Sequence, residues 1–179
     1  MEDYYTEFEK DDQEKFILDV NVQKKVRYQA KTPTIQTLYQ DWKDGDLIID
    51  PSFQRKYVWN KKKASNLIES ILINIPLPII FTSSKNGKEE VIDGQQRLTS
   101  IFTFLGGYFA DGTKFNLSKS LKILSEEIGG KSFASLDKSL QSSIKKYPMF
   151  VVSISEESDE DIKFEMFERL NTNITSLNQ

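Results

Sequence analysis

The 179-residue sequence contains neither cysteine nor histidine. Without cysteine there is no disulfide framework, no thiolate metal site and no thiol nucleophile. Without histidine the chain lacks the commonest general base, the commonest zinc ligand and every nucleophile activated by an imidazole. Any chemistry therefore depends on carboxylates, amides, hydroxyls, lysine, arginine or a bound metal ion.

Long apolar segments are also missing. No run of 18 or more apolar residues occurs, and the first 20 residues are acidic and lack the apolar region of a signal peptide. These absences predict no membrane contact and a cytoplasmic location. The hydrophobic content of 38% fits one globular domain with a core of its own.

The net charge of −3 is unevenly distributed. Residues 1–20 carry eight acidic side chains against two lysines, whereas the remainder holds 19 acidic and 22 basic residues. We expect an acidic, flexible tail over residues 1–24 and one mildly basic domain over residues 25–179. Solvation explains such a tail, and masking of a basic groove is the alternative.

The clearest local signal is a β-hairpin. Asn86-Gly87 suits both central positions of a type I′ turn and separates predicted strands over 79–83 and 89–92. Apolar spacing predicts further elements: helices over 34–43, 61–74, 94–105 and 158–170, strands over 47–49 and 149–154, and weaker amphipathic segments over 117–128 and 136–145. This order predicts a small α+β domain with a mixed sheet, including the hairpin, packed against several helices.

The stretch from Asp93 to Arg97 carries the most chemical information. It reads as the end of a strand, an N-cap at Asp93, and a polar first helical turn. A helix N-terminus attracts anions, so an arginine there is unfavourable by roughly 0.3–1 kcal/mol unless a negative group lies beside it. A phosphate is one candidate, because the Arg97 guanidinium can bind it through two donors.

The neighbouring side chains offer complementary roles. The amides of Gln95 and Gln96 are able to read a base or orient a water. Asp93 either caps the helix or holds Mg²⁺ beside a phosphate. From these residue types alone, an anion site and simple capping with solvation are equally supported.

A second segment, residues 53–63, packs five basic and three aromatic side chains into eleven positions. In an extended conformation its aromatic residues share one face. Basic groups with interleaved aromatics suit nucleic acid, through phosphate contacts and base stacking. The alternatives are core packing for Phe53, Tyr57 and Trp59 and a solvated surface for the lysines. A third segment, residues 167–178, is a helix end followed by a turn rich in Asn and Thr, which also fits an ordinary C-cap.

Four ordered motifs together resemble the N-terminal domain of GmrSD-type restriction endonucleases, a family marked by Asp-Gly-Gln-Gln-Arg. The motifs lie within residues 51–59, 67–78, 92–98 and 167–178. The resemblance covers residues 25–179 and implies a fold similar to that of ParB and sulfiredoxin. It also implies a nucleotide-binding regulatory or sensor domain of a bacterial system against phage or modified DNA, with slow Mg²⁺-dependent hydrolysis of an NTP of unknown base.

The resemblance assigns roles to residues. The catalytic set would be Asp93, Gln95, Gln96 and Arg97, with Asp93 as the metal ligand. The nucleotide would be bound by Gly94, Arg97, Gln54 and Arg55, with Gly94 giving the backbone room for the ligand.

Two departures from the family pattern have consequences. Asn173-Ile174 stands where the family usually has Gly-Gly, which removes the closest backbone approach to a ligand at that turn. The missing histidine excludes a nuclease of the His-Asn-His type from this chain, so we expect a fragment of a longer protein or a stand-alone sensor with a separate nuclease partner.

Two other functions remain open. The chain could be a DNA-binding module without enzymatic activity, or a scaffold for a partner nuclease, and homo-oligomers are compatible with each. The DNA-binding alternative uses a basic set of side chains: Arg55, Lys56, Lys61, Lys62 and Lys63.

Overall fold

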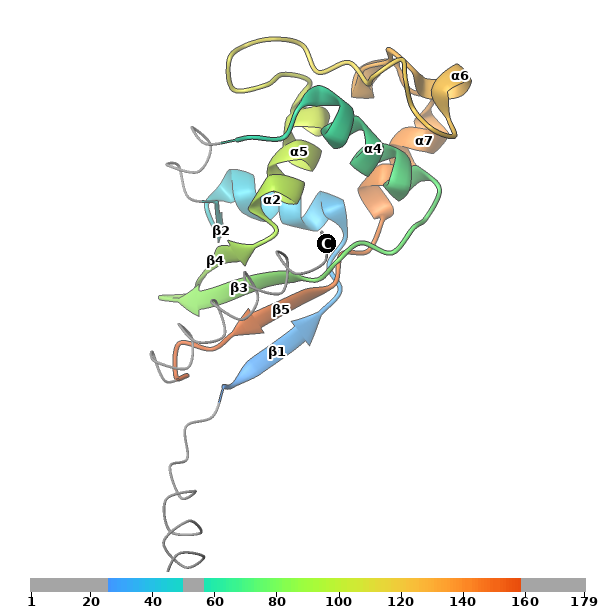
Figure 1. Cartoon of the computed structure of the whole chain (residues 1–179). Helices are drawn as coiled ribbons and strands as arrows, with labels where there is room; N and C mark the ends of the chain where they lie inside the picture. Colours follow the sequence, from blue (N-terminus) through green and yellow to red (C-terminus); the bar gives the residue numbers. More distant parts are fainter. Residues whose placement is uncertain (1–25, 50–56, 159–179) are drawn as a thin grey trace, which may run out of the picture.

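The computed structural model describes residues 26–49 and 57–158 of the chain. Within this part, five strands form one sheet in the order β1-β5-β3-β4-β2 (Figure 1). The strands are β1 (Tyr28–Lys31), β2 (Leu47–Ile48), β3 (Ile80–Lys85), β4 (Lys88–Asp93) and β5 (Val151–Ile154).

The sheet is mixed. β3 pairs with β4 and β1 pairs with β5 in antiparallel fashion, whereas β3–β5 and β2–β4 are parallel. The β3–β4 hairpin turns at Asn86 (φ 52°) and Gly87 (φ 73°), the positive angles that a type I′ turn requires. The structure thus confirms the predicted hairpin and the α+β class with a mixed sheet.

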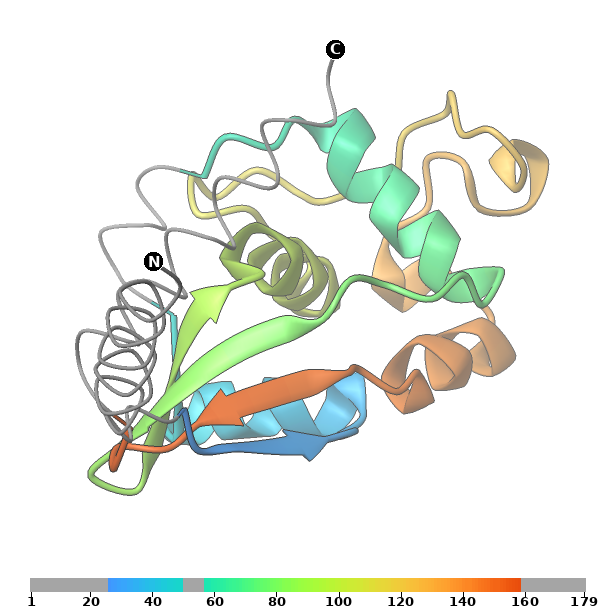
Figure 2. The same ribbon diagram turned by 60° about the horizontal axis from the view of Figure 1, so that its bottom comes forward.

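Five α-helices and one 3₁₀ helix accompany the sheet in the described part. They are α2 (Ile35–Asp44), α4 (Lys61–Leu72), α5 (Gln95–Gly106), α6 (Ser125–Ile128), η1 (Phe133–Ser135) and α7 (Lys138–Lys146). In Figure 1 the helices lie together on the upper side of the sheet, with β1 at the lower edge; Figure 2 gives the arrangement from a second direction. No described helix is both long and apolar enough to cross a membrane.

Local capping explains where two of the helices begin. The Thr34 side chain accepts a hydrogen bond from the Thr37 N–H, and Asn60 accepts one from the Lys63 N–H, as expected for N-caps. The apolar stripes predicted for α4 and α5 face the core, where Ile68, Leu98 and Ile101 are fully buried. Because α4 ends at Leu72, two residues earlier than predicted, Ile75 leaves that stripe and is 46% exposed.

Some predictions about the elements were wrong. Only residues 125–128 of the predicted segment 117–128 are helical, because the Glu69 carboxylate binds the N–H groups of Ile123 and Leu124 that a helix would use internally. Strand β1 was missed because most of its side chains are exposed and show no apolar alternation. The predicted helix over 158–170 lies almost wholly outside the described residues, as does the tail predicted over 1–24.

Candidate functional site

The joint between β4 and α5 is where the Asp-Gly-Gln-Gln-Arg stretch lies. Gly94, with φ of 97°, is the N-cap of α5, and among the described residues no side chain caps the first turn. The prediction of Asp93 as N-cap was therefore wrong: Asp93 is the last residue of β4, and its carboxylate binds Arg97 instead.

The fold itself explains why position 94 is a glycine. A Cβ at this position would lie 2.2 Å from Cδ1 of Ile80, and L side chains rarely adopt its positive φ. The space beside Gly94 is thus occupied by a fully buried core side chain from β3.

Arg97 is bound within the protein. Its Nη2 donates to Asp93 Oδ2 at 2.8 Å and to the Ile79 carbonyl at 3.1 Å, and its Nη1 donates to the Pro78 carbonyl. The side chain is only 12% exposed. Burial lowers the pKa of the Arg97 guanidinium, and Asp93 opposes this effect. The guanidinium therefore joins the start of α5 to the chain segment that leads into β3.

Three polar atoms on the next part of α5 lack partners. Gln95 Oε1, Gln96 Oε1 and Thr99 Oγ1 are buried, and the structure gives them no hydrogen bond within the described residues. The Gln95 amide is held at its other end, since Nε2 donates to the Val91 carbonyl at 2.9 Å. At spacings of three and four residues, these side chains lie along one side of the helix.

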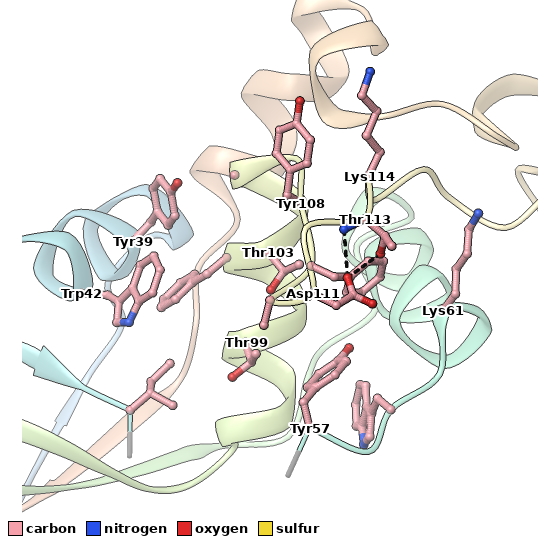
Figure 3. A pocket seen from close by; sticks show the side chains of 16 residues that line it. Tyr39, Trp42, Tyr57, Lys61, Thr99, Thr103, Tyr108, Asp111, Thr113 and Lys114 are labelled. Carbon is pink, nitrogen blue, oxygen red and sulfur yellow. Dashed lines mark hydrogen bonds between the residues drawn. The ribbon is translucent and has the colours of Figure 1, made fainter. Parts of the chain in front are cut away.

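A cavity of about 720 Å³ opens against the same helix, one turn beyond Gln95 and Gln96 (Figure 3). It is enclosed by α2, α5, residues 57–61 and the loop over 108–114. The lining residues described are Tyr39, Trp42, Ile49, Tyr57, Trp59, Lys61, Thr99, Phe102, Thr103, Gly106, Tyr108, Phe109, Ala110, Asp111, Thr113 and Lys114.

Aromatic side chains dominate this cavity. Figure 3 shows Thr99 and Thr103 on α5 between Tyr39 and Trp42 on one side and Tyr57 on the other. The Tyr57 hydroxyl lies 2.8 Å from Ser100 Oγ, which fixes the ring against α5. Burial raises the pKa of Tyr57, so its hydroxyl is protonated at neutral pH. Flat rings at fixed positions are suited to hold a planar ligand by stacking.

The charged residues of the cavity are Lys61, Lys114 and Asp111. Asp111 Oδ1 accepts hydrogen bonds from the Thr113 N–H at 2.9 Å and the Thr113 hydroxyl at 2.7 Å. These bonds lower the pKa of Asp111, so the carboxylate is ionised at neutral pH. The described lining thus has one net positive charge.

In the described part of the structure, the predicted site residues of the basic aromatic segment and those of residues 93–97 do not line the same cavity. The cavity lining that the structure describes includes Tyr57, Trp59 and Lys61 from the basic aromatic segment, but none of residues 93–97. Gln54, Arg55 and Lys56, predicted to form the opposite wall or a DNA contact, lie outside the described residues, as does the turn at 171–178. The catalytic roles given to Asp93, Gln95, Gln96 and Arg97 stay predictions.

Sequence reasoning missed most of the residues that line the cavity. Thr99 and Thr103 continue the polar side of α5 at spacings of three and seven from Gln96, a signal that could have been followed. Nothing in the sequence pointed to Tyr108, Phe109 or Lys114, which reach the cavity only through the path of their loop.

Comparison with known families gives one match. The family model for the N-terminal domain of the GmrSD restriction endonuclease matches residues 35–179. The chain belongs to this GmrSD family. It is therefore part of a restriction system, and the resemblance inferred from the four motifs is confirmed. No curated protein and no solved structure matches the chain significantly.

Membership of the GmrSD family also suggests a nuclease domain as partner in the full protein. Within the described residues, no three acidic side chains lie close enough together to form a metal site. The expected Mg²⁺ ligand Asp93 is 30% exposed and forms its ion pair with Arg97.

Proposed function

We propose that this chain is a nucleotide-binding regulatory domain of its restriction system, with the base held in the aromatic cavity beside α5. One observation carries the proposal: Thr99, whose hydroxyl is buried and without a partner in the described structure, is one of the residues that line this cavity.

Unpartnered polar atoms are a strong reason to expect a ligand. Buried polar groups are nearly always hydrogen-bonded, because an unpaired one costs about 1–3 kcal/mol. Thr99 Oγ1 can both donate and accept, and the Gln95 and Gln96 amides carry unpaired oxygens one turn earlier. The edges of nucleotide bases present the complementary donors and acceptors.

The other properties of the cavity agree with a nucleotide. Its 720 Å³ lies within the range of small-ligand pockets, roughly 300–1,000 Å³. Aromatic walls provide stacking surfaces for a base, worth about 1–3 kcal/mol per base. Lys61 and Lys114 supply positive charge for a phosphate.

Hydrolysis of the nucleotide is a separate prediction. Phosphoryl transfer needs positioned charges and Mg²⁺ more than a strong base, so the lack of histidine is no obstacle. Asp93, however, binds Arg97, and a metal would have to share or replace that ion pair. Release of phosphate from ATP or GTP with and without Mg²⁺ tests turnover independently of binding.

The binding test uses an intrinsic probe. The chain has two tryptophans, Trp42 and Trp59, and both line the cavity. Titration with ATP, GTP, CTP and UTP should therefore change tryptophan fluorescence, and calorimetry should give the same affinities. If no nucleotide produces a signal by either method at millimolar concentration, the proposal is wrong.

A matched pair of variants locates the site. Thr99→Val removes the unpartnered hydroxyl with little change of shape and should weaken nucleotide binding about five- to tenfold. The folded state should be as stable as wild type or slightly more stable, because no hydrogen bond within the protein is lost. Thr32→Val, at an exposed position away from the cavity, is the control and should bind like wild type.

A DNA-binding module is the second candidate. It is favoured by Lys61, Lys62 and Lys63, which are exposed in the first turn of α4 where no acidic residue accompanies them. The salt dependence separates the two functions. Affinity for duplex DNA should fall with log salt by about 0.9 per phosphate contacted, far more steeply than affinity for a mononucleotide in a cavity.

A further inference from the structure

We infer that the nucleotide lies with its phosphate end toward Lys61 and Lys114, at the rim of the cavity, and not toward Arg97. This inference rests on the proposed function, and it assigns phosphate contacts to two lysines from different parts of the chain. Lys61 is the first residue of α4, and Lys114 ends the lining loop.

The first reason is that Arg97 is already engaged. Its two terminal nitrogens donate to Asp93 and to the carbonyls of Pro78 and Ile79, and its side chain is mostly buried. A phosphate would have to take the guanidinium from a carboxylate and two carbonyls. The described cavity lining, moreover, does not include Arg97.

The second reason is that the two lysines are unpaired. The ion pairs found within the described residues are Arg27–Glu157, Lys31–Glu89 and Arg97–Asp93, so neither Lys61 nor Lys114 has an acidic partner there. Asp111 lies on the same cavity but binds Thr113 rather than a lysine. Figure 3 shows both lysine side chains extending away from Thr99.

The third reason is the charge at the start of α4. Lys61, Lys62 and Lys63 occupy its first turn, where the helix dipole disfavours cations. Lys63 lies over the Trp59 ring, 4.5 Å from its centre, and Asn60 caps only the Lys63 N–H. An anion beside Lys61 would offset this repulsion while the base occupies the aromatic cavity next to it.

This orientation leaves the phosphate at an open rim, away from the β4–α5 joint, so it predicts that a nucleotide bound in this way is not hydrolysed by Asp93 and Arg97. The ligand can therefore be a free nucleotide or a nucleotide within a DNA strand whose base enters the cavity, as enzymes that extrude bases do. Both present the same chemistry to Lys61 and Lys114, namely a phosphate attached to a stacked base.

The experiment compares ligands that share one base and sugar and differ in the number of phosphate groups. Adenosine, AMP, ADP and ATP, or the series of the preferred base, are titrated against tryptophan fluorescence with wild type, Lys61→Gln, Lys114→Gln and the double variant. We expect affinity to rise at least about tenfold from nucleoside to triphosphate, and each single variant to lose about five- to tenfold for the triphosphate. Nucleoside affinity should stay within about twofold, because stacking is unchanged.

The control is Lys138→Gln, an exposed lysine at the start of α7 that does not line the cavity, and it should bind like wild type. Equal affinity for nucleoside and triphosphate, or lysine variants that bind the triphosphate like wild type, overturns the inference but leaves base binding in place. Failure of the nucleoside and all nucleotides to bind removes the proposed function and the inference together.

A last comparison identifies the source of the phosphate. If a short single-stranded oligodeoxynucleotide binds more tightly than the mononucleotide, and loses affinity in both lysine variants, the ligand is a nucleotide of a strand. If ATP or another triphosphate binds more tightly, the ligand is a free nucleotide. Either result retains the lysine contacts.

Discussion

The first two turns of α5 both carry polar side chains, but they differ in what those side chains bind. At the first turn, Arg97 binds Asp93 and the carbonyls of Pro78 and Ile79. At the start of the second turn, Thr99 has a buried hydroxyl without a partner in the described structure, and the residue lines the cavity. The charge of Arg97 made the first turn the obvious candidate site, whereas the unpaired polar atoms run from Gln95 and Gln96 in the first turn to Thr99 in the second.

Arg97 and Thr99 illustrate two different reasons why a polar side chain is buried in a protein. A buried charge needs its partners for the fold to be stable, and within the first turn the protein supplies them. A buried hydroxyl without a partner costs free energy in the unliganded protein, and a ligand can recover that cost. Variants in the first turn should therefore change the free energy of unfolding, whereas variants at Thr99 should change nucleotide affinity.

The largest effect is expected for Gly94→Ala. An L side chain rarely adopts its positive φ, and the added Cβ would lie 2.2 Å from Cδ1 of the fully buried Ile80, so that side chain or the backbone beside it must shift. We expect a loss of roughly 2–4 kcal/mol in the free energy of unfolding, measured by urea denaturation. A variant with wild-type stability and weakened nucleotide binding would instead show that Gly94 serves the ligand, as the sequence suggested.

Arg97→Gln should have the next largest effect. It removes the donors to two carbonyls and leaves Asp93 without its cation, so we expect a loss of about 2–3 kcal/mol in the free energy of unfolding. Nucleotide affinity, measured on the fraction that remains folded, should change less than in Lys61→Gln. The opposite pattern, with full stability and lost binding, would make Arg97 the phosphate ligand.

Glu69 is a second buried charge whose partners are supplied by the protein, and its contribution to stability depends on pH. This buried carboxylate on α4 accepts the N–H groups of Ile123 and Leu124, both at 2.8 Å, and of Lys122 at 3.4 Å. Burial raises its pKa, but the three N–H donors and the charge of Lys122 together outweigh burial and lower the pKa from the ordinary 4.5. The stabilisation is therefore fully present above pH 4.5 and is lost as the pH falls through the lowered value.

Glu69→Gln isolates this effect. At neutral pH we expect the variant to lose about 1–2 kcal/mol in the free energy of unfolding, because the charge behind the hydrogen bonds is gone. The difference from wild type should shrink as the pH is lowered below 4.5, as followed by urea denaturation across a pH series. A difference that stays constant with pH would show that the carboxylate is not ionised in the folded protein.

The smallest effect is expected for Tyr57→Phe. The variant loses the hydrogen bond to Ser100 Oγ, while Ser100 still donates to the Gln96 carbonyl at 2.7 Å. We expect a loss of about 0.5–1.5 kcal/mol in thermal or urea denaturation, with the ring still available for stacking. Weaker nucleotide binding that exceeds this loss would mean that the hydroxyl itself contacts the ligand.

Much of the fold could be predicted because its signals are local. Asn86-Gly87 set the hairpin turn, Thr34 and Asn60 cap their helices, and the apolar stripe of α5 is buried as its spacing required. The failures arose where distant groups took over a local role: the Glu69 carboxylate binds the N–H groups of residues 122–124, and the carbonyls of Pro78 and Ile79 help to hold Arg97 against Asp93. Sequence periodicity contains no information about such contacts.

The residues of the candidate site likewise fall into those that local sequence indicated and those that only packing brought together. Tyr57, Trp59 and Lys61 were singled out by residue type and spacing, and they do line the cavity. Their partners Tyr39, Thr103 and Lys114 come from elements far apart in the chain, so their approach depends on how α2, α5 and the loop over 108–114 pack.

The amino-acid order alone set the family, the hairpin and the helix caps, since each depends on residues close together in the chain. Packing of distant elements decided that β1 joins β5, that Arg97 reaches the carbonyls of Pro78 and Ile79, and that Thr99 is left with a hydroxyl unpaired in the described structure. The physical reason is that a hydrogen bond or a cavity is a property of atoms brought together in space, and separation along the chain does not specify it.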